Sequence, residues 1–176
     1  MNLGVPGSTV ADALAQQLPE ALRLAPTVAT VWLNVNDLLA AVPVGTYEAQ
    51  VTRLLTGLRR GGRTRVLVAH TPPLERLPAY LACRPGAPPG GCALPDAPVI
   101  PGPDLVVAAV AAYNAAIARA AAASGAEVVD LAAVVTAARA AGTDAGLVSG
   151  DGFHPSRAGH QAVADAFAAV LRRKPA

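Results

Sequence analysis

Aromatic residues are scarce in this sequence: they make up 3% of its 176 residues, whereas hydrophobic residues make up 53%. Alanine and valine supply much of that hydrophobic content, so we expect a core packed from small aliphatic side chains. A chain of this length buries roughly 70% of its unfolded surface, which is enough for a real core. We therefore predict a single domain over residues 1–176.

Lysine is nearly absent, and the arginines are scattered along the chain. Lys174 is the one lysine, and the formal net charge is +2. Nucleic-acid binding proteins typically carry a basic stripe with interleaved aromatic residues, and the sequence has no such stripe. The sequence therefore predicts no nucleic-acid partner. The basic run from Arg172 to Lys174 is typical of a solvated helix end, where the helix dipole favours positive charge.

Long apolar runs are also lacking. None reaches the roughly 18 residues that a membrane span needs, so we expect no membrane span. Met1 is followed at once by Asn2, Leu3 and Gly4, which is not the pattern of a secretory signal peptide. The compartment stays open, because a natural start further upstream could carry a leader that directs the protein out of the cytoplasm.

Cysteine occurs only twice, as Cys83 and Cys92, on either side of a segment rich in proline and glycine. The two thiols can close a small disulfide loop, which would favour an extracytoplasmic compartment. They can equally be two free thiols in a loop. Both interpretations stay open, because spacing alone does not establish the geometry of a disulfide.

Continuous apolar runs that are rich in β-branched residues predict three strands, at 28–33, 65–70 and 126–131. Such runs are typical of strands that are buried on both faces of a parallel sheet. Capping residues predict helices between them: one begins after Ser8 or Thr9 and ends near 24, and others span 46–58, 103–124 and 156–172. The alternation indicates a layered α/β fold, with a long irregular loop over 71–102.

The most informative motif is Asp151-Gly152-Phe153-His154-Pro155, just before the last predicted helix. The spacing lets the Asp151 carboxylate accept the Nδ1 proton of His154, which leaves Nε2 as a general base. A nucleophilic hydrolase also needs an activated serine, and none is obvious. Nothing marks Ser149 as a nucleophile, and Ser8 and Ser156 are expected to be helix caps.

Other polar residues follow the predicted strands, where parallel sheets bind their ligands. Asn34, Asn36 and Asp37 follow the first strand, and His70 ends the second. We expect Asp37 to orient its own turn by local hydrogen bonds, and His70 to be an ordinary residue at a strand end.

Three blocks in the same order, residues 2–9, 31–38 and 151–155, resemble the SGNH hydrolases, which are also called GDSL-type lipases and acylhydrolases. The resemblance covers nearly the whole chain, and the last block is the most specific. It implies a flavodoxin-like three-layer α/β/α sandwich with a parallel sheet. It also implies cleavage of a small-molecule ester or thioester through a serine acyl-enzyme, without a cofactor.

The resemblance also implies roles for four residues. Asp151 and His154 match the family's acid and base. Gly7 matches the glycine whose backbone N–H serves the oxyanion hole, and Asn36 matches the asparagine that completes it. Such neutral donors can be fixed where the oxyanion develops, and losing one typically costs about 10²–10³ in rate.

Two departures from the family pattern stand out. Asn34 occupies the position of a glycine, which is expected to narrow the pocket or to alter the local backbone. In addition, the family's first block, a strand ending in Gly-Asp-Ser with the nucleophile, should precede Asn2. We therefore expect an N-terminally truncated domain without its first strand, in which the strand at 28–33 has an unpaired edge. Without the upstream serine, this chain is expected to be inactive.

Other interpretations compete with this one. The chain can instead be a non-catalytic ligand-binding module that retains the hydrolase fold. A metal site at Asp151, His154 and His70 is weakly supported, because zinc sites usually present three or four close ligands. A phosphate-binding turn at 4–7 lacks the lysine of a P-loop and the third glycine of a dinucleotide motif. The oligomeric state stays open.

Overall fold

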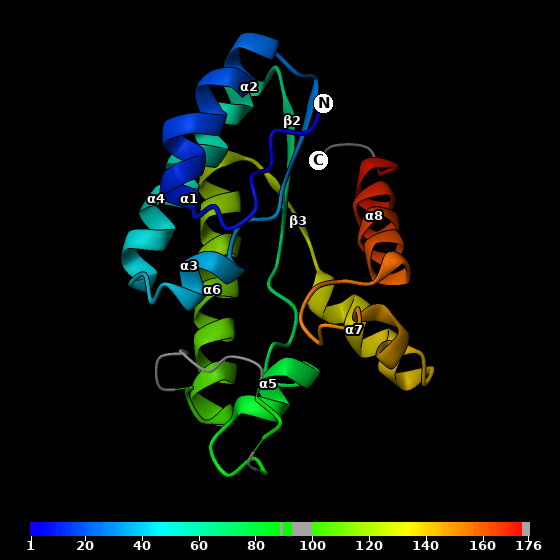
Figure 1. The fold of residues 1–176 in the computed structure, drawn as a ribbon. Coiled ribbons are helices and arrows are strands. Elements are labelled where there is room, and N and C mark those ends of the chain that lie inside the picture. The colour runs from blue at the N-terminus through cyan, green and yellow to red at the C-terminus, as the bar shows by residue number, and fades with distance from the viewer. Residues whose placement is uncertain (89, 93–99, 174–176) are drawn as a thin grey trace. The chain divides into compact units, whose positions relative to one another are not determined.

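A computed structural model describes residues 1–88, 90–92 and 100–173 of the chain (Figure 1). Lys174 and part of the predicted irregular loop, 93–99, therefore lie outside the described residues. The chain divides into two compact units: unit 1 contains residues 1–71 and 112–130, and unit 2 contains residues 72–111 and 131–176. The expectation of one domain over the whole chain stays a prediction.

The centre of unit 1 is a parallel sheet with the strand order β1-β2-β3. Its strands are β1 (Val28–Val31), β2 (Arg65–Ala69) and β3 (Glu127–Val129). All three predicted strands are confirmed, each shorter than its apolar run. In the described sheet β1 pairs only with β2, so β1 is an edge strand. The α/β fold with a parallel sheet is therefore confirmed.

The N-terminal helical segment of unit 1 consists of α1 (Val10–Asp12), a π-helical turn (Ala13–Gln17) and α2 (Leu18–Leu24). Thr9 caps it, because its hydroxyl accepts a hydrogen bond from Asp12 N and the Asp12 carboxylate accepts one from Thr9 N. The expected cap at Ser8 is wrong, since the Ser8 hydroxyl accepts from the Gln17 side chain instead. Pro19 lies in the first turn of α2, where its missing backbone N–H is tolerated.

Helix α4 (Val44–Arg59) follows the short helix α3 (Val35–Leu39). It begins after Pro43 rather than at Thr46, because Pro43 O accepts a hydrogen bond from Tyr47 N and closes the first turn. It ends where Arg60 and Gly61 take left-handed conformations, with φ of 50° and 66°. The predicted start was therefore two residues late, and the predicted end lies within one residue of the observed end.

Helix α6 (Pro103–Ser124) has the predicted bounds and contributes residues to both units. An 18-residue window of it has a mean hydropathy of 1.6, which passes the length and composition test for a membrane span. Asp104, Asn114 and Arg119 interrupt its apolar residues, so the helix does not form one uninterrupted apolar run. Its buried positions nevertheless recur every three or four residues, and its Arg119 forms an ion pair with Glu48 of α4. This one-sided burial is typical of a core helix in a folded domain.

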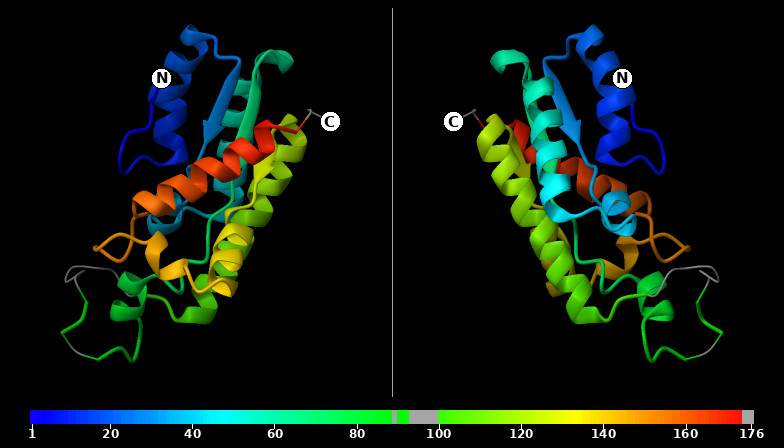
Figure 2. Two further views of the ribbon diagram at one scale, coloured as in Figure 1. Left: turned by 90° about the vertical axis from the view of Figure 1, so that its right-hand side faces the viewer. Right: turned by 90° about the vertical axis from the view of Figure 1, so that its left-hand side faces the viewer.

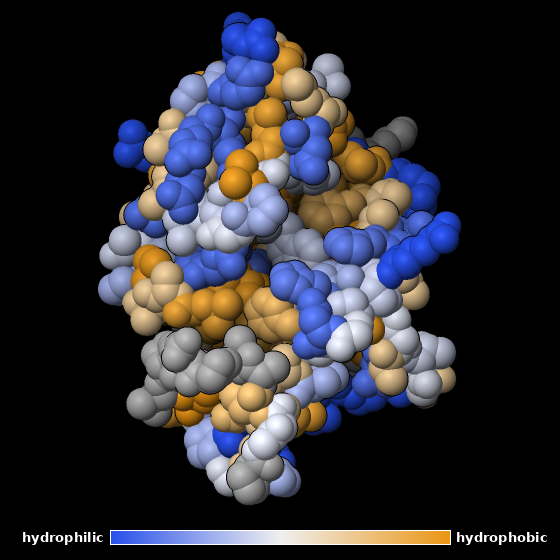
Figure 3. All heavy atoms as spheres, viewed as in Figure 1, coloured by the Kyte–Doolittle hydropathy of each residue, from blue (hydrophilic) through white to orange (hydrophobic). Residues whose placement is uncertain are grey.

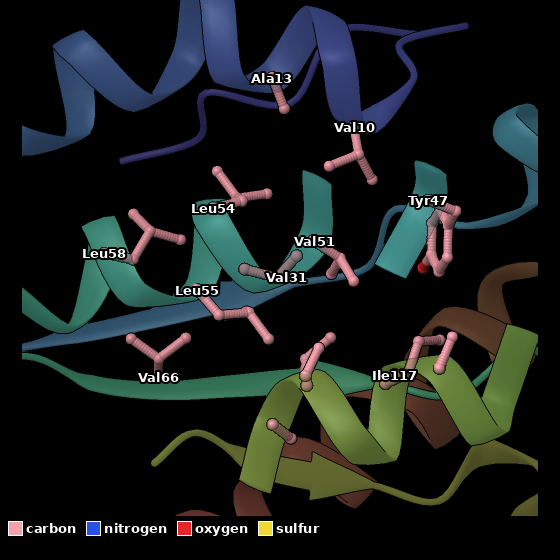
Figure 4. Close-up of a cluster of buried hydrophobic side chains, with 14 of the residues drawn as sticks. Val10, Ala13, Val31, Tyr47, Val51, Leu54, Leu55, Leu58, Val66 and Ile117 are labelled. Atoms are coloured by element: carbon pink, nitrogen blue, oxygen red, sulfur yellow. The ribbon is translucent and has the colours of Figure 1, made fainter. Parts of the chain in front are cut away.

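The core of unit 1 lies between the sheet and a layer of helices (Figure 4). Helix α4 turns Val51, Leu54, Leu55 and Leu58 inward at the spacing of one helix face. Figure 4 shows Leu54 near Val10 and Ala13 of the N-terminal helical segment, while Leu55 lies over the strands. The aliphatic core predicted from the composition is confirmed, with a pair of tyrosines at one end of it.

That tyrosine pair joins α4 to α6. The rings of Tyr47 and Tyr113 stack with their centroids 4.4 Å apart. The Tyr47 hydroxyl donates to Leu33 O at 2.8 Å, and the Tyr113 hydroxyl donates to Val42 O at 2.6 Å. Both acceptors flank α3, so the tyrosine pair fixes the two ends of the segment that contains Asn36.

Large apolar side chains remain exposed in unit 1 around α2 and β1, where orange surface appears near α2 in Figure 3. Leu22, Leu24 and Val28 are between 38% and 42% exposed. Val28 lies on β1, the edge strand of the described sheet.

Unit 2 contains α5 (Pro78–Cys83), α7 (Leu131–Ala140) and α8 (Arg157–Leu171), all visible in Figure 1 and again from two sides in Figure 2. Ser156 caps α8 by accepting from Gly159 N, as predicted. Helix α5 lies within the stretch that was predicted to be wholly irregular, so that prediction was wrong over these six residues. Cys83, the last residue of α5, forms a disulfide with Cys92, which excludes the interpretation of two free thiols.

Candidate active site

The Asp151–His154 motif of unit 2 forms a tight turn between the short 3₁₀-helix Asp144–Leu147 and α8. An antiparallel bridge joins Val148 to Pro155. Inside it, Ser149 N donates to His154 O at 2.8 Å, and Gly152 N donates to Ser149 O at 3.0 Å. The turn is therefore closed by backbone hydrogen bonds before any side chain contributes.

The carboxylate of Asp151 lies at the centre of this turn. Its Oδ2 is 2.7 Å from His154 Nδ1, while its Oδ1 accepts from Phe153 N at 2.8 Å and His154 N at 3.0 Å. Oδ1 also accepts from the Ser149 hydroxyl at 2.6 Å. The pKa of Asp151 lies well below its ordinary value because these donors stabilise the ionised carboxylate. The Ser149 hydroxyl has the largest effect, followed by the backbone N–H of Phe153 and by His154.

The state of the imidazole follows from this geometry. An ionised carboxylate can only accept hydrogen bonds, so His154 Nδ1 carries the proton and Nε2 presents a lone pair. The stability that the ionised Asp151 contributes is fully present above its ordinary pKa of 3.8 and is lost as the pH falls through the lower folded-state pKa. The structure thus forms the pair that the spacing predicts, while its role in catalysis stays a prediction.

Helix α5 supports the turn from a different part of unit 2. Ala79 N donates to Gly152 O at 3.0 Å. A Cβ at Gly152 would lie 2.9 Å from Ala79 N and 3.1 Å from Pro78 Cβ, and Gly152 has a φ of +74°. Both the conformation and the close approach of α5 therefore require glycine here.

Gly152→Ala is expected to lower the free energy of unfolding by about 1–3 kcal/mol, because the methyl group must displace α5 and the backbone is strained. Gly150→Ala is the matched control two residues away, since a Cβ there meets nothing within 4 Å and no positive φ is involved. Urea denaturation monitored by circular dichroism compares the two variants. Equal stability of the two would contradict the close packing of α5 on the turn.

The other two predicted site residues lie in unit 1. Gly7 lies in the turn that precedes the first helical segment, closed by Ser8 N donating to Val5 O at 3.2 Å. Its φ is +80°, and a Cβ there would meet nothing within 4 Å, so the backbone conformation alone favours glycine. In the part of the chain that the structure describes, the Gly7 N–H has no acceptor.

Asn36 lies in α3 and contacts the Gly7 turn. Its Nδ2 donates to Ser8 O at 3.0 Å. An amide nitrogen carries two protons, so this bond fixes the side chain and leaves the second N–H available. The structure therefore brings Gly7 and Asn36 to one place within unit 1, as it brings Asp151 and His154 together within unit 2.

Asp37 makes a second link between α3 and the N-terminal helical segment. Both of its carboxylate oxygens accept from Val10 N at 3.1 Å, across 27 positions of sequence. Asp37 also accepts a local hydrogen bond from its own backbone N–H, so the expectation of local hydrogen bonds was incomplete: the bonds from Val10 join two distant segments. Burial raises the pKa of the Asp37 carboxyl, and the hydrogen bond from Val10 partly offsets that effect.

His70 lies at the carboxyl end of β2, beside the end of β3. Its backbone N–H donates to Val129 O at 3.0 Å, and its Nδ1 is 3.7 Å from an oxygen of Asp130. Among the described residues, no group of three or more histidine, cysteine or acidic side chains is placed to hold a metal ion. His70 is therefore a strand-end residue with one long acidic contact.

The sequence matches one known protein family. Residues 1–162 match the sequence profile of the GDSL-like lipase/acylhydrolase family, which is most of the chain and includes both pairs of site residues. The chain belongs to this family. Family membership therefore places the protein among the hydrolases. A search among curated proteins found no match in sequence.

Solved structures of similar fold include a lipase/acylhydrolase from Enterococcus faecalis, at 20% identity and a TM-score of 0.70 over 100% of this chain and 77% of that one. An acetylxylan esterase from Geobacillus stearothermophilus has 19% identity and a TM-score of 0.67 over 99% of this chain and 72% of that one. An α/β hydrolase from the metagenome of Lake Arreo has 22% identity and a TM-score of 0.64 over 93% of this chain and 67% of that one. These likenesses show a shared α/β fold.

This member of the GDSL-like family differs from the family pattern at Asn34. The Asn34 side chain is buried, and its Nδ2 donates to Ala69 O at 3.2 Å. The asparagine thus ties the segment that follows β1 to the end of β2, a bond that glycine cannot make. Its Oδ1 has no hydrogen-bond partner among the described residues, which is an uncompensated cost of burying it.

The four serines of this family member each bond to a group other than the His154 ring. The Ser8 hydroxyl accepts from Gln17, and the Ser124 hydroxyl donates to Ala120 O within α6. The Ser156 hydroxyl donates to Gly146 O, and the Ser149 hydroxyl donates to Asp151. Sequence reasoning had given Ser149 no role, although its position two residues before the acid is a signal that could have found it.

Proposed function

We propose that this protein hydrolyses carboxylic esters or thioesters through an acyl-enzyme, with His154 as the general base. The observation that carries the proposal is the 2.7 Å contact between Asp151 Oδ2 and His154 Nδ1 in a turn that holds the carboxylate ionised. This contact sets the tautomer in which Nε2 can accept a proton. The match to the GDSL-like family over residues 1–162 supports the same reaction class.

In the proposed reaction, a serine hydroxyl attacks the ester carbonyl while His154 Nε2 takes its proton. Asp151 stabilises the imidazolium that forms, without itself becoming protonated. The Gly7 N–H and the second N–H of Asn36 stabilise the oxyanion. His154 then gives the proton to the leaving alcohol, or to the leaving thiol of a thioester. In the second half of the reaction, His154 takes a proton from a water molecule that attacks the acyl-enzyme. His154 then returns this proton to the serine oxygen as the acid is released.

We further propose that the attacking serine comes from a segment upstream of Asn2, and that residues 1–176 alone are inactive. Two observations support this. All four serines of the chain have hydroxyl partners other than His154. In addition, β1 has one unpaired edge in the described sheet, with Val28 41% exposed, where a further parallel strand can pair.

The test compares residues 1–176 with the protein extended through the coding sequence upstream of Met1. We expect negligible turnover of a short-chain nitrophenyl ester by residues 1–176, and no labelling by a fluorophosphonate. The extended protein should gain both, and His154→Ala should abolish them. If residues 1–176 hydrolysed the ester and His154→Ala abolished that turnover, the nucleophile would lie within these residues and the upstream assignment would be wrong. An extended protein that is inactive on a broad ester panel would favour the non-catalytic binding module.

A further inference from the structure

Ser149 is the one serine whose hydroxyl contacts the Asp151–His154 pair. Its Oγ lies 2.6 Å from Asp151 Oδ1, which is shorter than either backbone N–H contact to the same oxygen. An acceptor-only carboxylate must receive the hydroxyl proton, so Ser149 is the donor. A nucleophilic serine would instead donate to His154 Nε2, the nitrogen opposite the one that faces Asp151. Ser149 is therefore not placed as the nucleophile.

The backbone of Ser149 is held as firmly as its side chain. Its N–H donates to His154 O, and its carbonyl accepts from Gly152 N. The neighbouring bridge between Val148 and Pro155 closes the same turn. Because these bonds fix the Cα of Ser149 relative to His154, the hydroxyl is presented to Asp151 from a fixed direction.

The two oxygens of the Asp151 carboxylate have different hydrogen-bond partners. Oδ1 receives three donors, from Ser149, Phe153 and His154, while Oδ2 receives the His154 ring. Three donors fill the accepting positions of Oδ1, so Oδ2 is the oxygen left for Nδ1. The Asp151 side chain is 50% exposed, so water would otherwise compete for both oxygens.

We infer that Ser149 is a positioning residue, whose hydroxyl orients the Asp151 carboxylate so that Oδ2 faces His154 Nδ1. The hydroxyl also helps to keep Asp151 ionised, and an ionised partner holds His154 in the tautomer with Nε2 unprotonated. The consequence for turnover rests on the proposed function above. The consequence for the pair itself does not, because the pair lies entirely within the described part of unit 2.

The test uses Ser149→Ala in residues 1–176, with Ser149→Thr as the variant that keeps a hydroxyl. Ser124→Ala is the matched control, because the Ser124 hydroxyl bonds only to carbonyls of its own helix. Carboxyl-carbon and ring-nitrogen NMR titrations report the ionisation of Asp151 and the tautomer of His154. Ser149→Ala should raise the pKa of Asp151 toward its ordinary value and reduce the population with a proton on Nδ1. Ser149→Thr should behave like the original protein.

The inference is overturned if Ser149→Ala and Ser124→Ala give the same Asp151 titration and the same His154 tautomer, with both variants folded. In the active extended protein, Ser149→Ala should lower kcat about tenfold with little change in KM, since it removes one hydrogen bond to a charged group. An altered titration in residues 1–176, together with an extended protein that hydrolyses no ester, would support Ser149 as a positioning residue and refute the proposed function. The two failures are therefore distinguishable.

Discussion

Asp151→Asn is expected to lower kcat of the extended, active protein by about 10⁴, because a carboxamide in place of the carboxylate disfavours the tautomer that leaves Nε2 free to act as a base. KM should change little, since the hydrogen bonds of Asp151 all lie within the turn. The measurement is steady-state hydrolysis of a nitrophenyl ester. Asparagine keeps the shape of the side chain, so the two backbone N–H groups can still donate to its oxygen and the turn should fold.

The matched control for this variant is Asp144→Asn. Asp144 lies in the same unit, in the 3₁₀-helix before the turn, and forms a partly exposed ion pair with Arg139 at 3.3 Å. Exposed ion pairs contribute about 0–1 kcal/mol, so this variant should keep both stability and turnover. If Asp144→Asn lost as much activity as Asp151→Asn, charge loss in unit 2 in general would account for the effect, and the specific role of Asp151 would be refuted.

Tyr47→Ala is expected to lower the free energy of unfolding by about 3–5 kcal/mol, the range for removing a large buried aromatic side chain. Tyr47 is 0% exposed and stacks on Tyr113 in the core of unit 1. The variant leaves a cavity, and it also leaves Leu33 O without its hydrogen-bond donor. Urea denaturation followed by circular dichroism measures the loss.

Tyr47→Phe separates the two contributions, because it keeps the stacked ring and removes only the hydroxyl. It should cost about 1 kcal/mol, the typical net value of one hydrogen bond. Burial raises the pKa of the neighbouring Tyr113 to about 12, so that hydroxyl remains a donor to Val42 O at neutral pH. A Tyr47→Phe variant as unstable as Tyr47→Ala would show that the hydroxyl, rather than ring packing, anchors this part of the core.

Much of the secondary structure was predictable because its signals are local. The runs at 28–33, 65–70 and 126–131 became strands, and Pro103 and Gly125 bound α6 as expected. The predictions of helix starts and caps that were wrong also have local causes. Helix α4 begins at Val44, two residues before Thr46, because Pro43 precedes it as the N-cap. Thr9 caps the first helix because Asp12 completes a capping box with it. Helix α5 was missed because the surrounding prolines and glycines predict a loop.

The sequence by itself determined the Asp151–His154 pair and the family. Asp151 and His154 are three residues apart in a turn, so local geometry lets their side chains meet, and the structure has that contact at 2.7 Å. Only the tertiary structure decided how α3 is held. Asn36 and Asp37 bond to Ser8 and Val10, which are 28 and 27 positions away. Such contacts depend on how β1 and the helices pack, and no spacing along the chain encodes them. The same holds for Gly152, whose need for glycine comes partly from α5, and for Cys83, whose pairing with Cys92 required bond geometry.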